Sequence, residues 1–368
     1  MNVIEKYFRK KSDKVSFIEL KDNFEHYRDY GIEDIPLPII LNDMMMGMTN
    51  SEFDNEIKIE YIIDGILYMI AIDPEFIYIN EYKKILGKLL DNSSKYALLK
   101  SVKFYNKNFE KVLLFTRAAF LLDEQNEMAA YSYAKLLWNI DVSKEYKEVF
   151  VEQAIRILER ILRYNESYSL ANFELGNISK ATGKFIKANN FYNRALRNAE
   201  FEELKDAIRD EMNKIAPDVA VENAIYYINK MDYSTAISEL MEARKNSSRY
   251  DIPYYLAIAY MNKENPKLAE QFFEESIEKG ADFATLYTDL VYIKYVLKKD
   301  VEALHLANDA IEKYPSEIKL RYNRAIILIS LNQFDKAIED FNFILEYQDL
   351  SDEMFNQIMK IKESIINR

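Results

Sequence analysis

The sequence predicts an all-α fold, and the scarcity of chain-breaking residues is the first reason. Only 7 Gly and 7 Pro occur among 368 residues, whereas average usage would place roughly 12% of a chain in these two types. Turns in β-rich domains and phosphate-binding loops both depend on the backbone geometry of glycine or proline. Hydrophobic residues make up 49% and charged residues 30% of the chain, which is typical of a folded protein rather than a disordered one. We therefore expect long helices joined by short turns.

Composition also narrows the classes of function. The chain has no cysteine, which excludes disulfides, thiolate metal sites and cysteine nucleophiles. A net charge of −12 disfavours nucleic acid or an anionic membrane as the main partner. The first residues lack the apolar core of a secretory signal, and the most apolar stretches, such as Ile62–Ile72, fall short of the ~20 residues that span a bilayer. We expect a cytoplasmic protein without membrane insertion.

A repeat of helix, short turn and helix is the second reason for an all-α fold. Residues 227–243, 260–276 and 328–344 read YINKMDYSTAISELMEA, YMNKENPKLAEQFFEES and LISLNQFDKAIEDFNFI. Each segment is a helix end, a turn and a new helix with alanine at a fixed place. Two helix axes approach to ~8 Å only where side chains are small. The alanines at this place, spaced by 33, 34 and 34 residues, are Ala236, Ala269, Ala303 and Ala337.

This pattern resembles the tetratricopeptide repeat, a helix–turn–helix unit of 34 residues with small residues where its helices A and B cross. The crossing places read Gly176, Ala188 and Ala195 in one unit. The resemblance implies an α-solenoid, a right-handed superhelix of such units preceded here by an N-terminal helical segment. About seven units are predicted, and they start at residues 93, 127, 169, 217, 250, 284 and 318.

The spacing of the units predicts the organisation of the chain. Insertions near 141–148 and 203–216 lengthen two units. The second insertion has apolar residues at helical spacing, so we expect the preceding helix B to run on until Pro217 stops it. The predicted regions are an N-terminal helical region over 1–92, a repeat array over 93–351 and a C-terminal capping helix over 352–368.

Net charge changes sign along the chain. It is −7 over residues 1–92, +4 over residues 93–202 and −9 over residues 203–368. Because the second change coincides with the 203–216 insertion, we expect two sub-arrays joined by a long helix. The net positive charge of residues 93–202 is compatible with an acidic partner.

Residues 1–92 show no clear repeat. We expect a helix from Val15 to Tyr30, extended backbone at Pro36 and Pro38, a helix capped by Ser51 that runs through Ile72, and another opened by Pro74 that runs through Leu90. These elements are either degenerate repeats or a separate helical bundle, and both alternatives stay open.

No catalytic, metal or cofactor site is indicated. His26 and His305 each lie in an amphipathic segment without a second histidine nearby. Residues 176–185, GNISKATGKF, lack the glycine spacing and the Ser/Thr of a phosphate-binding loop. The methionines at 44–46 and 48 have no neighbouring cysteine or histidine to form a soft-metal site. We expect a protein that is not an enzyme and needs no cofactor and no metal.

Helix A lines the concave side of the array in the family that this sequence resembles, so its inward positions are the candidate partner-binding residues. Aromatic rings and amides there suit recognition of a peptide. A lysine and asparagine clamp for a C-terminal carboxylate is not indicated, because Asn177 is present but Phe173 replaces the lysine. An apolar or aromatic ligand segment is expected instead. The candidates are Tyr131, Lys135, Trp138, Phe173, Asn177, Lys180, Tyr254, Tyr255, Asn262, Asp289, Tyr292, Tyr322 and Asn323.

The function expected from these observations is a non-catalytic protein–protein interaction scaffold that binds a peptide or helix of another protein in its groove. The alternative is a peptide-responsive cytoplasmic bacterial regulator, because such regulators are similar in length and place a helical bundle before about seven repeats. That likeness is one of layout, and no helix-turn-helix DNA reader is evident in residues 1–92. Homo-oligomerisation is left open.

Overall fold

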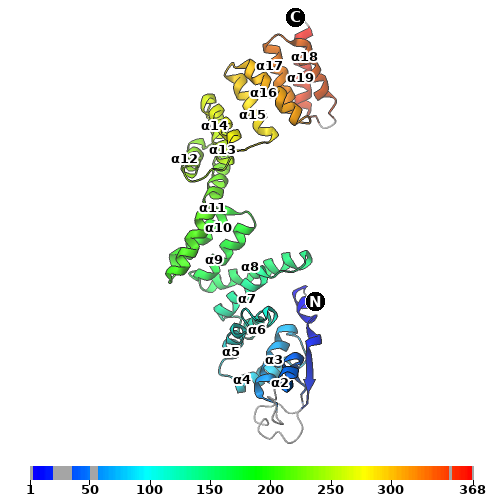
Figure 1. Ribbon diagram of the computed structural model, residues 1–368, viewed down its shortest axis with the longest axis vertical. Helices are drawn as coiled ribbons and strands as arrows, with labels where there is room; N and C mark the ends of the chain where they lie inside the picture. Colours follow the sequence, from blue (N-terminus) through cyan, green and yellow to red (C-terminus); the bar gives the residue numbers. More distant parts are fainter. Residues whose placement is uncertain (1–2, 20–34, 50–56, 348–349, 367–368) are drawn as a thin grey trace. The chain divides into compact units, whose positions relative to one another are not determined.

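A computed structural model describes residues 3–19, 35–49, 57–347 and 350–366 (Figure 1). The chain divides into two compact units, residues 1–210 and 211–368, and each is described by itself. The predicted all-α class is confirmed, because the described residues are helical apart from turns and one pair of short strands. No helix in this described part is both long enough and apolar enough to cross a membrane.

The N-terminal unit begins with a mixed module. β1 and β2 pair antiparallel, with Val15 opposite Ile40. The predicted helix from Val15 to Tyr30 is therefore wrong over Val15–Ile18. β-Branched and aromatic residues there pair with a strand far along the sequence, which a local pattern does not reveal. Residues 20–34, which hold the rest of that prediction and His26, lie outside the described residues. The elements are α1 (Val3–Arg9), a 3₁₀ turn (Ser12–Lys14), β1 (Val15–Ile18), β2 (Leu37–Ile40), α2 (Leu41–Thr49), α3 (Ile59–Ile72) and α4 (Ile79–Leu89).

Helix α3 forms the centre of this module, and β2 lies directly against it. A Cβ atom on Gly65 would lie 1.7 Å from the carbonyl oxygen of Pro38, so only glycine admits the strand at this distance. The predicted extended backbone at Pro38 is confirmed by β2. Helix α3 ends at Ile72 as predicted, whereas Ser51 lies outside the described residues.

The helix predicted to open at Pro74 begins later, at Ile79. The Asp73 carboxylate accepts a hydrogen bond from the Glu75 backbone N–H at 3.2 Å. A sequence of aspartate followed by proline favours a turn, so Pro74 is not the first residue of the helix. The prediction of its start is therefore wrong by five residues, because the side chain of Asp73 stabilises a turn at this point.

Three antiparallel helix hairpins complete the N-terminal unit. Their A helices begin at Ser93, Glu127 and Ser169, where the sequence places the unit starts. The insertion near 141–148 lies where helix α8 begins, and α8 has 21 residues against 14 in α10. The hairpins are α5 (Ser93–Lys103) with α6 (Phe109–Leu122), α7 (Glu127–Asn139) with α8 (Lys144–Tyr164), and α9 (Ser169–Ala181) with α10 (Phe185–Asn198).

Small residues lie where the A and B helices cross. A Cβ atom on Gly176 would lie 2.4 Å from the Tyr192 ring, and Ala188 and Ala195 are fully buried. Their size is thus what lets the helices of one unit approach closely. The same fully buried crossing alanines recur in the C-terminal unit at Ala236, Ala269, Ala303 and Ala337.

Helix α11 (Glu202–Asn229) corrects the expectation for the second insertion. Helix B of the preceding unit does not run on, since α10 ends at Asn198 and α11 begins a few residues later. Pro217 lies inside α11 rather than ending it. A proline inside a helix costs ~3 kcal/mol, but Ile215 and Ala224, on either side of Pro217, are buried and hold the helix by packing.

The C-terminal unit repeats the hairpin. Residues of α11 after Pro217 act as helix A for α12, and three further hairpins follow. In the last helix the Ser351 hydroxyl accepts a hydrogen bond from the Met354 N–H at 3.3 Å, as a helix cap. The helices are α12 (Tyr233–Arg244), α13 (Asp251–Asn262), α14 (Pro266–Glu278), α15 (Ala284–Val296), α16 (Asp300–Lys313), α17 (Ile318–Ser330), α18 (Phe334–Leu345) and α19 (Asp352–Ile366).

The turn between helix A and helix B has one backbone conformation in five units. In the α15–α16 turn, the N–H of Lys299 donates to the Lys294 carbonyl at 3.0 Å, the bond of a left-handed helix end. Such a conformation strains every residue except glycine. The left-handed residues are Gly183, Met231, Glu264, Lys298 and Asn332, with φ between 57° and 69°.

Candidate functional site

The thirteen candidate residues all lie on A helices. Six belong to α7 and α9 in the N-terminal unit, and seven belong to α13, α15 and α17 in the C-terminal unit. We call these two sets the N-terminal A-helix face and the C-terminal A-helix face. The first comprises Tyr131, Lys135, Trp138, Phe173, Asn177 and Lys180. The second comprises Tyr254, Tyr255, Asn262, Asp289, Tyr292, Tyr322 and Asn323.

Trp138 joins two neighbouring A helices in the N-terminal unit. Its indole N–H donates a hydrogen bond of 2.6 Å to Glu174, which is buried on α9. The other carboxylate oxygen of Glu174 is buried without a hydrogen-bond partner. A buried carboxylate is stable only when hydrogen-bond donors compensate for its lost hydration. The hydrogen bond from the Trp138 indole therefore holds α7 against α9.

Tyr131 is also used for packing. Its side chain is buried, its ring lies 6.3 Å from that of Tyr168, and the Lys135 ammonium lies 5.8 Å from its ring centre. Burial, with the nearby Glu174 carboxylate as a smaller cause, raises the pKa of the Tyr131 hydroxyl. Lys135 itself is exposed. Lys135 is therefore an accessible polar group on α7.

Asn177 and Phe173 both contact Tyr192 of helix α10. The Tyr192 hydroxyl donates to the Asn177 side-chain oxygen at 2.8 Å, and the Phe173 ring lies 5.7 Å from the Tyr192 ring. The asparagine that matches the family's carboxylate clamp is thus already hydrogen-bonded within its own repeat. Lys180, at the end of α9, is partly exposed.

A carboxylate and a tyrosine join α13 to α15 on the C-terminal A-helix face. The Tyr254 hydroxyl donates to the Asp289 carboxylate. Burial raises the pKa of Asp289 to about 6, although the hydrogen bond from Tyr254 and the charge of Lys319 both oppose the rise. Asp289 therefore holds its negative charge against a desolvation penalty at neutral pH.

A hollow of about 210 Å³ lies between α15 and α17 on the same face. Its walls are Tyr292, Tyr295, Tyr322, Asn323 and Ile326. Asn323 is fixed by a hydrogen bond of 3.1 Å from its side-chain N–H to the Thr288 carbonyl on α15, and Tyr292 is 48% exposed. The hollow thus combines three tyrosines from two adjacent repeats with one exposed ring at its edge.

The remaining candidates of this face do not border the hollow. Tyr255 is half-buried with its ring 5.2 Å from that of Tyr254. Asn262 is exposed and donates to the Ile258 carbonyl of its own helix at 2.8 Å. The structure thus brings Tyr292, Tyr322 and Asn323 together around one cavity, and Tyr254 and Asp289 together in one hydrogen bond.

A larger pocket of about 660 Å³ in the N-terminal unit was not predicted. Helices α2, α3 and α5, the turn before α6 and α6 itself line it. A weak signal exists in the sequence, because the lysines at 95, 100, 103, 107 and 111 recur at helical spacing. Nothing in that spacing says which helix faces them. Among the described residues no group of three histidine, cysteine or acidic side chains is placed to hold a metal ion.

Comparison with known proteins bears on the repeat itself. No family model matches the chain. A TPR repeat-containing protein of Methanocaldococcus jannaschii is 26% identical over 83 residues, which are 23% of this chain and 24% of the relative. The chain thus matches about a quarter of that relative's length.

Solved structures with a similar chain path have low sequence identity. YrrB, described as a TPR protein with an unusual peptide-binding site, matches 55% of this chain and 97% of its own at 18% identity, with a TM-score of 0.40. MamA matches 50% of this chain and 96% of its own at 15% identity, with a TM-score of 0.37. The curated relative and the recurring hairpins with small crossing residues together identify the units as tetratricopeptide repeats.

Proposed function

We propose that this tetratricopeptide-repeat protein is a non-catalytic interaction scaffold of the cytoplasm, and that it binds a peptide or helix of a partner protein on its C-terminal A-helix face. The observation that carries this proposal is the hollow between α15 and α17. It is lined almost entirely by tyrosine rings and an aliphatic side chain, and it has one fixed amide.

Tyrosine-rich hollows suit recognition of side chains that carry apolar area. Rings give a large contact area with little loss of conformational freedom, and anchor residues in such pockets dominate binding energy. Asn323 is fixed to α15 by its own hydrogen bond, so its carbonyl oxygen stays available to accept from a ligand N–H. An aromatic or aliphatic anchor on an extended segment therefore fits the hollow best.

Capture of partners with a matched pair of variants tests this proposal. Full-length protein, Tyr292→Ala and Tyr226→Ala are each used to capture proteins and peptides from extract, followed by mass spectrometry. Tyr292 borders the hollow, whereas Tyr226 is 54% exposed on α11 of the same unit and does not line it. We expect Tyr292→Ala to weaken capture about tenfold, because truncating an anchor ring costs more than ~1 kcal/mol, and Tyr226→Ala to leave it unchanged.

Equal capture by all three proteins would place the binding surface elsewhere. Trp138→Ala is a poor probe of the N-terminal A-helix face, because it would leave the buried Glu174 carboxylate without its donor. Lys135→Ala is the better probe there, since Lys135 is exposed.

The regulator alternative rests on layout. Helices α1–α4 precede the repeat hairpins as a module with its own strand pair. Retention of short peptides without any partner protein in the capture experiment would favour the regulator over the scaffold.

A further inference from the structure

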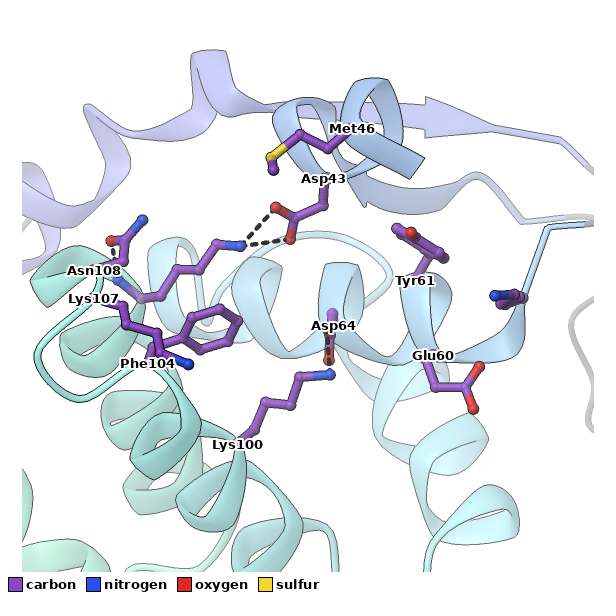
Figure 2. A pocket seen from close by; sticks show the side chains of 11 residues that line it. Asp43, Met46, Glu60, Tyr61, Asp64, Lys100, Phe104, Lys107 and Asn108 are labelled. Carbon is purple, nitrogen blue, oxygen red and sulfur yellow. Dashed lines mark hydrogen bonds and ion pairs between the residues drawn. The ribbon is translucent and has the colours of Figure 1, made fainter. Parts of the chain in front are cut away.

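The pocket of about 660 Å³ in the N-terminal unit has a wall from each of several elements (Figure 2). Asp43 and Met46 come from α2, Asp64 from α3, Lys100 from α5 and Lys111 from α6. Its volume lies within the range of about 300–1,000 Å³ that is usual for ligand sites. The proposed function does not use this pocket.

Two ion pairs form the inner part of the pocket. The Lys100 side chain points at the Asp64 carboxylate (Figure 2), and the ammonium nitrogen lies 2.7 Å from a carboxylate oxygen. The Lys111 ammonium lies 2.6 Å from the Asp43 carboxylate. All four side chains are 20% exposed or less. Burial raises the pKa of Asp64 in spite of the Lys100 ammonium. The two aspartates are therefore neutralised by lysines within a partly desolvated wall.

The rim of the pocket has charged side chains without partners among the described residues. Lys58 and Lys107 line the rim, and their side-chain ammonium groups have no hydrogen-bond or ion-pair partner among the described residues. Glu60 is an exposed carboxylate on the same rim. Because the two lysines outnumber this carboxylate, the spare charge of the rim is positive.

Apolar surface lines the same pocket. The Lys111 ammonium lies 4.5 Å from the ring centre of Phe104, which follows α5, and Met46 is 65% exposed. Exposed methionine adapts to different apolar partners. A ligand that satisfies both features carries an anionic group next to an apolar one.

We propose that this pocket binds a carboxylate carried next to an aromatic or aliphatic group, with Lys58 and Lys107 as the residues that attract it. A cationic ligand is disfavoured, because both inner aspartates already have lysine partners. The ligand chemistry has two sources, an acidic segment of a protein and a free small carboxylate. Both would place the anion at the rim lysines and the apolar group against Phe104 and Met46.

Ligand-observed NMR with full-length protein tests the proposal. The probes are N-acetyl-Phe-Glu-Leu-Glu-amide, its counterpart with glutamine in place of both glutamates, and phenylacetate. We expect the acidic peptide to bind at least about fivefold tighter than the glutamine peptide, and its affinity to fall as salt rises. Binding of phenylacetate as tight as that of the acidic peptide would identify a free small carboxylate as the source. Binding of the peptide alone would identify a protein segment.

A matched set of lysine variants locates the site. The double variant Lys58→Gln with Lys107→Gln should weaken binding of the acidic peptide about five- to tenfold, since each exposed ion pair contributes a small factor. Lys103→Gln is the control, because Lys103 is exposed on α5 but does not line the pocket. All three lysines are exposed, so their substitution should leave the fold unchanged, and circular dichroism of each variant checks this.

Four results would overturn the proposal. The first three are equal affinity for the acidic and glutamine peptides, absence of binding by both carboxylate probes at millimolar concentration, and an unchanged affinity of the double variant. An effect of Lys103→Gln as large as that of the double variant would do the same, because it would show attraction by general surface charge.

Discussion

Asp289→Asn is the substitution whose effect the structure specifies most fully. Asp289 lies between α13 and α17 on the C-terminal A-helix face, hydrogen-bonded by Tyr254 and near the charge of Lys319. Burial raises its pKa from 3.8 to about 6. A raised carboxyl pKa means that the folded state favours the neutral form more than the unfolded state does.

The sign of the effect on stability follows from this shift. The contribution of Asp289 to stability is greatest below its ordinary pKa of 3.8 and is lost as the pH rises through the folded value of about 6. Two pKa units correspond to about 3 kcal/mol, and screening of a partly exposed group reduces this to about 2 kcal/mol. Asparagine keeps an acceptor for the Tyr254 hydroxyl and carries no charge. Asp289→Asn should therefore stabilise the C-terminal unit by about 2 kcal/mol at pH 7.5.

Urea unfolding at several pH values measures the difference between the variant and the native protein. We expect the gap to be full at pH 7.5, to shrink through pH 6 and to fall below about 1 kcal/mol at pH 4.5. Asp309→Asn is the matched control, because Asp309 is an exposed carboxylate on α16 of the same unit. A gap that stays constant with pH, or a variant less stable than the native protein at pH 7.5, would refute the assignment of a desolvated carboxylate.

Three further predictions concern stability, each measured by urea unfolding of the full chain. Lys298→Gly should stabilise the chain by about 1 kcal/mol by relieving a left-handed φ of 63°, and Gly183→Ala should cost about as much at its φ of 69°. Gly65→Ala should cost ~3 kcal/mol or prevent folding, because the added Cβ would lie 1.7 Å from a carbonyl oxygen of β2. Gly87→Ala in α4 is its control: the added Cβ meets no atom within 4 Å, so the substitution should stabilise the chain by ~0.5–1 kcal/mol. Ala236→Leu should cost ~1–3 kcal/mol by overpacking a fully buried helix crossing. An unchanged free energy of unfolding at any of these sites would contradict the backbone conformation or the close contact described for that site.

The helix hairpins could be predicted because their signal is local and repeated. A small residue is required wherever two helices of a unit cross, so Ala236, Ala269, Ala303 and Ala337 recur near 34-residue spacing. The repeat pattern then predicts where each unit begins. Helices do begin at Ser93, Glu127 and Ser169, the predicted unit starts.

Features that depend on distant partners could not be predicted in the same way. The strand Val15–Ile18 exists because Leu37–Ile40 pairs with it, and strand propensity depends strongly on such partners. Pro217 reads as a helix stop by local rules, but burial of Ile215 and Ala224 keeps α11 continuous. In each case packing outweighs the local preference.

The candidate surface was predictable as a set of positions but not as a set of contacts. The repeat register places Trp138, Asn177 and Tyr292 on A helices. Only the structure distinguishes their roles, because Trp138 and Asn177 hydrogen-bond to Glu174 and Tyr192 while Tyr292 borders an open hollow. The repeat register predicts which residues lie on the A-helix faces. Contacts with neighbouring repeats then determine which of these side chains are free to bind a partner.

The two units offer surfaces of different chemistry, which argues for two ligands rather than one. The ammonium groups of Lys58 and Lys107 at the rim of the N-terminal pocket have no partner among the described residues. The C-terminal A-helix face has instead a hollow with three tyrosines and, elsewhere on the face, the partly buried carboxylate of Asp289. A carboxylate ligand that suits the first surface would be repelled near Asp289 at neutral pH. The lysine variants and Tyr292→Ala should therefore weaken capture of different molecules, and weaker capture of the same partner by both would contradict the assignment of two ligands.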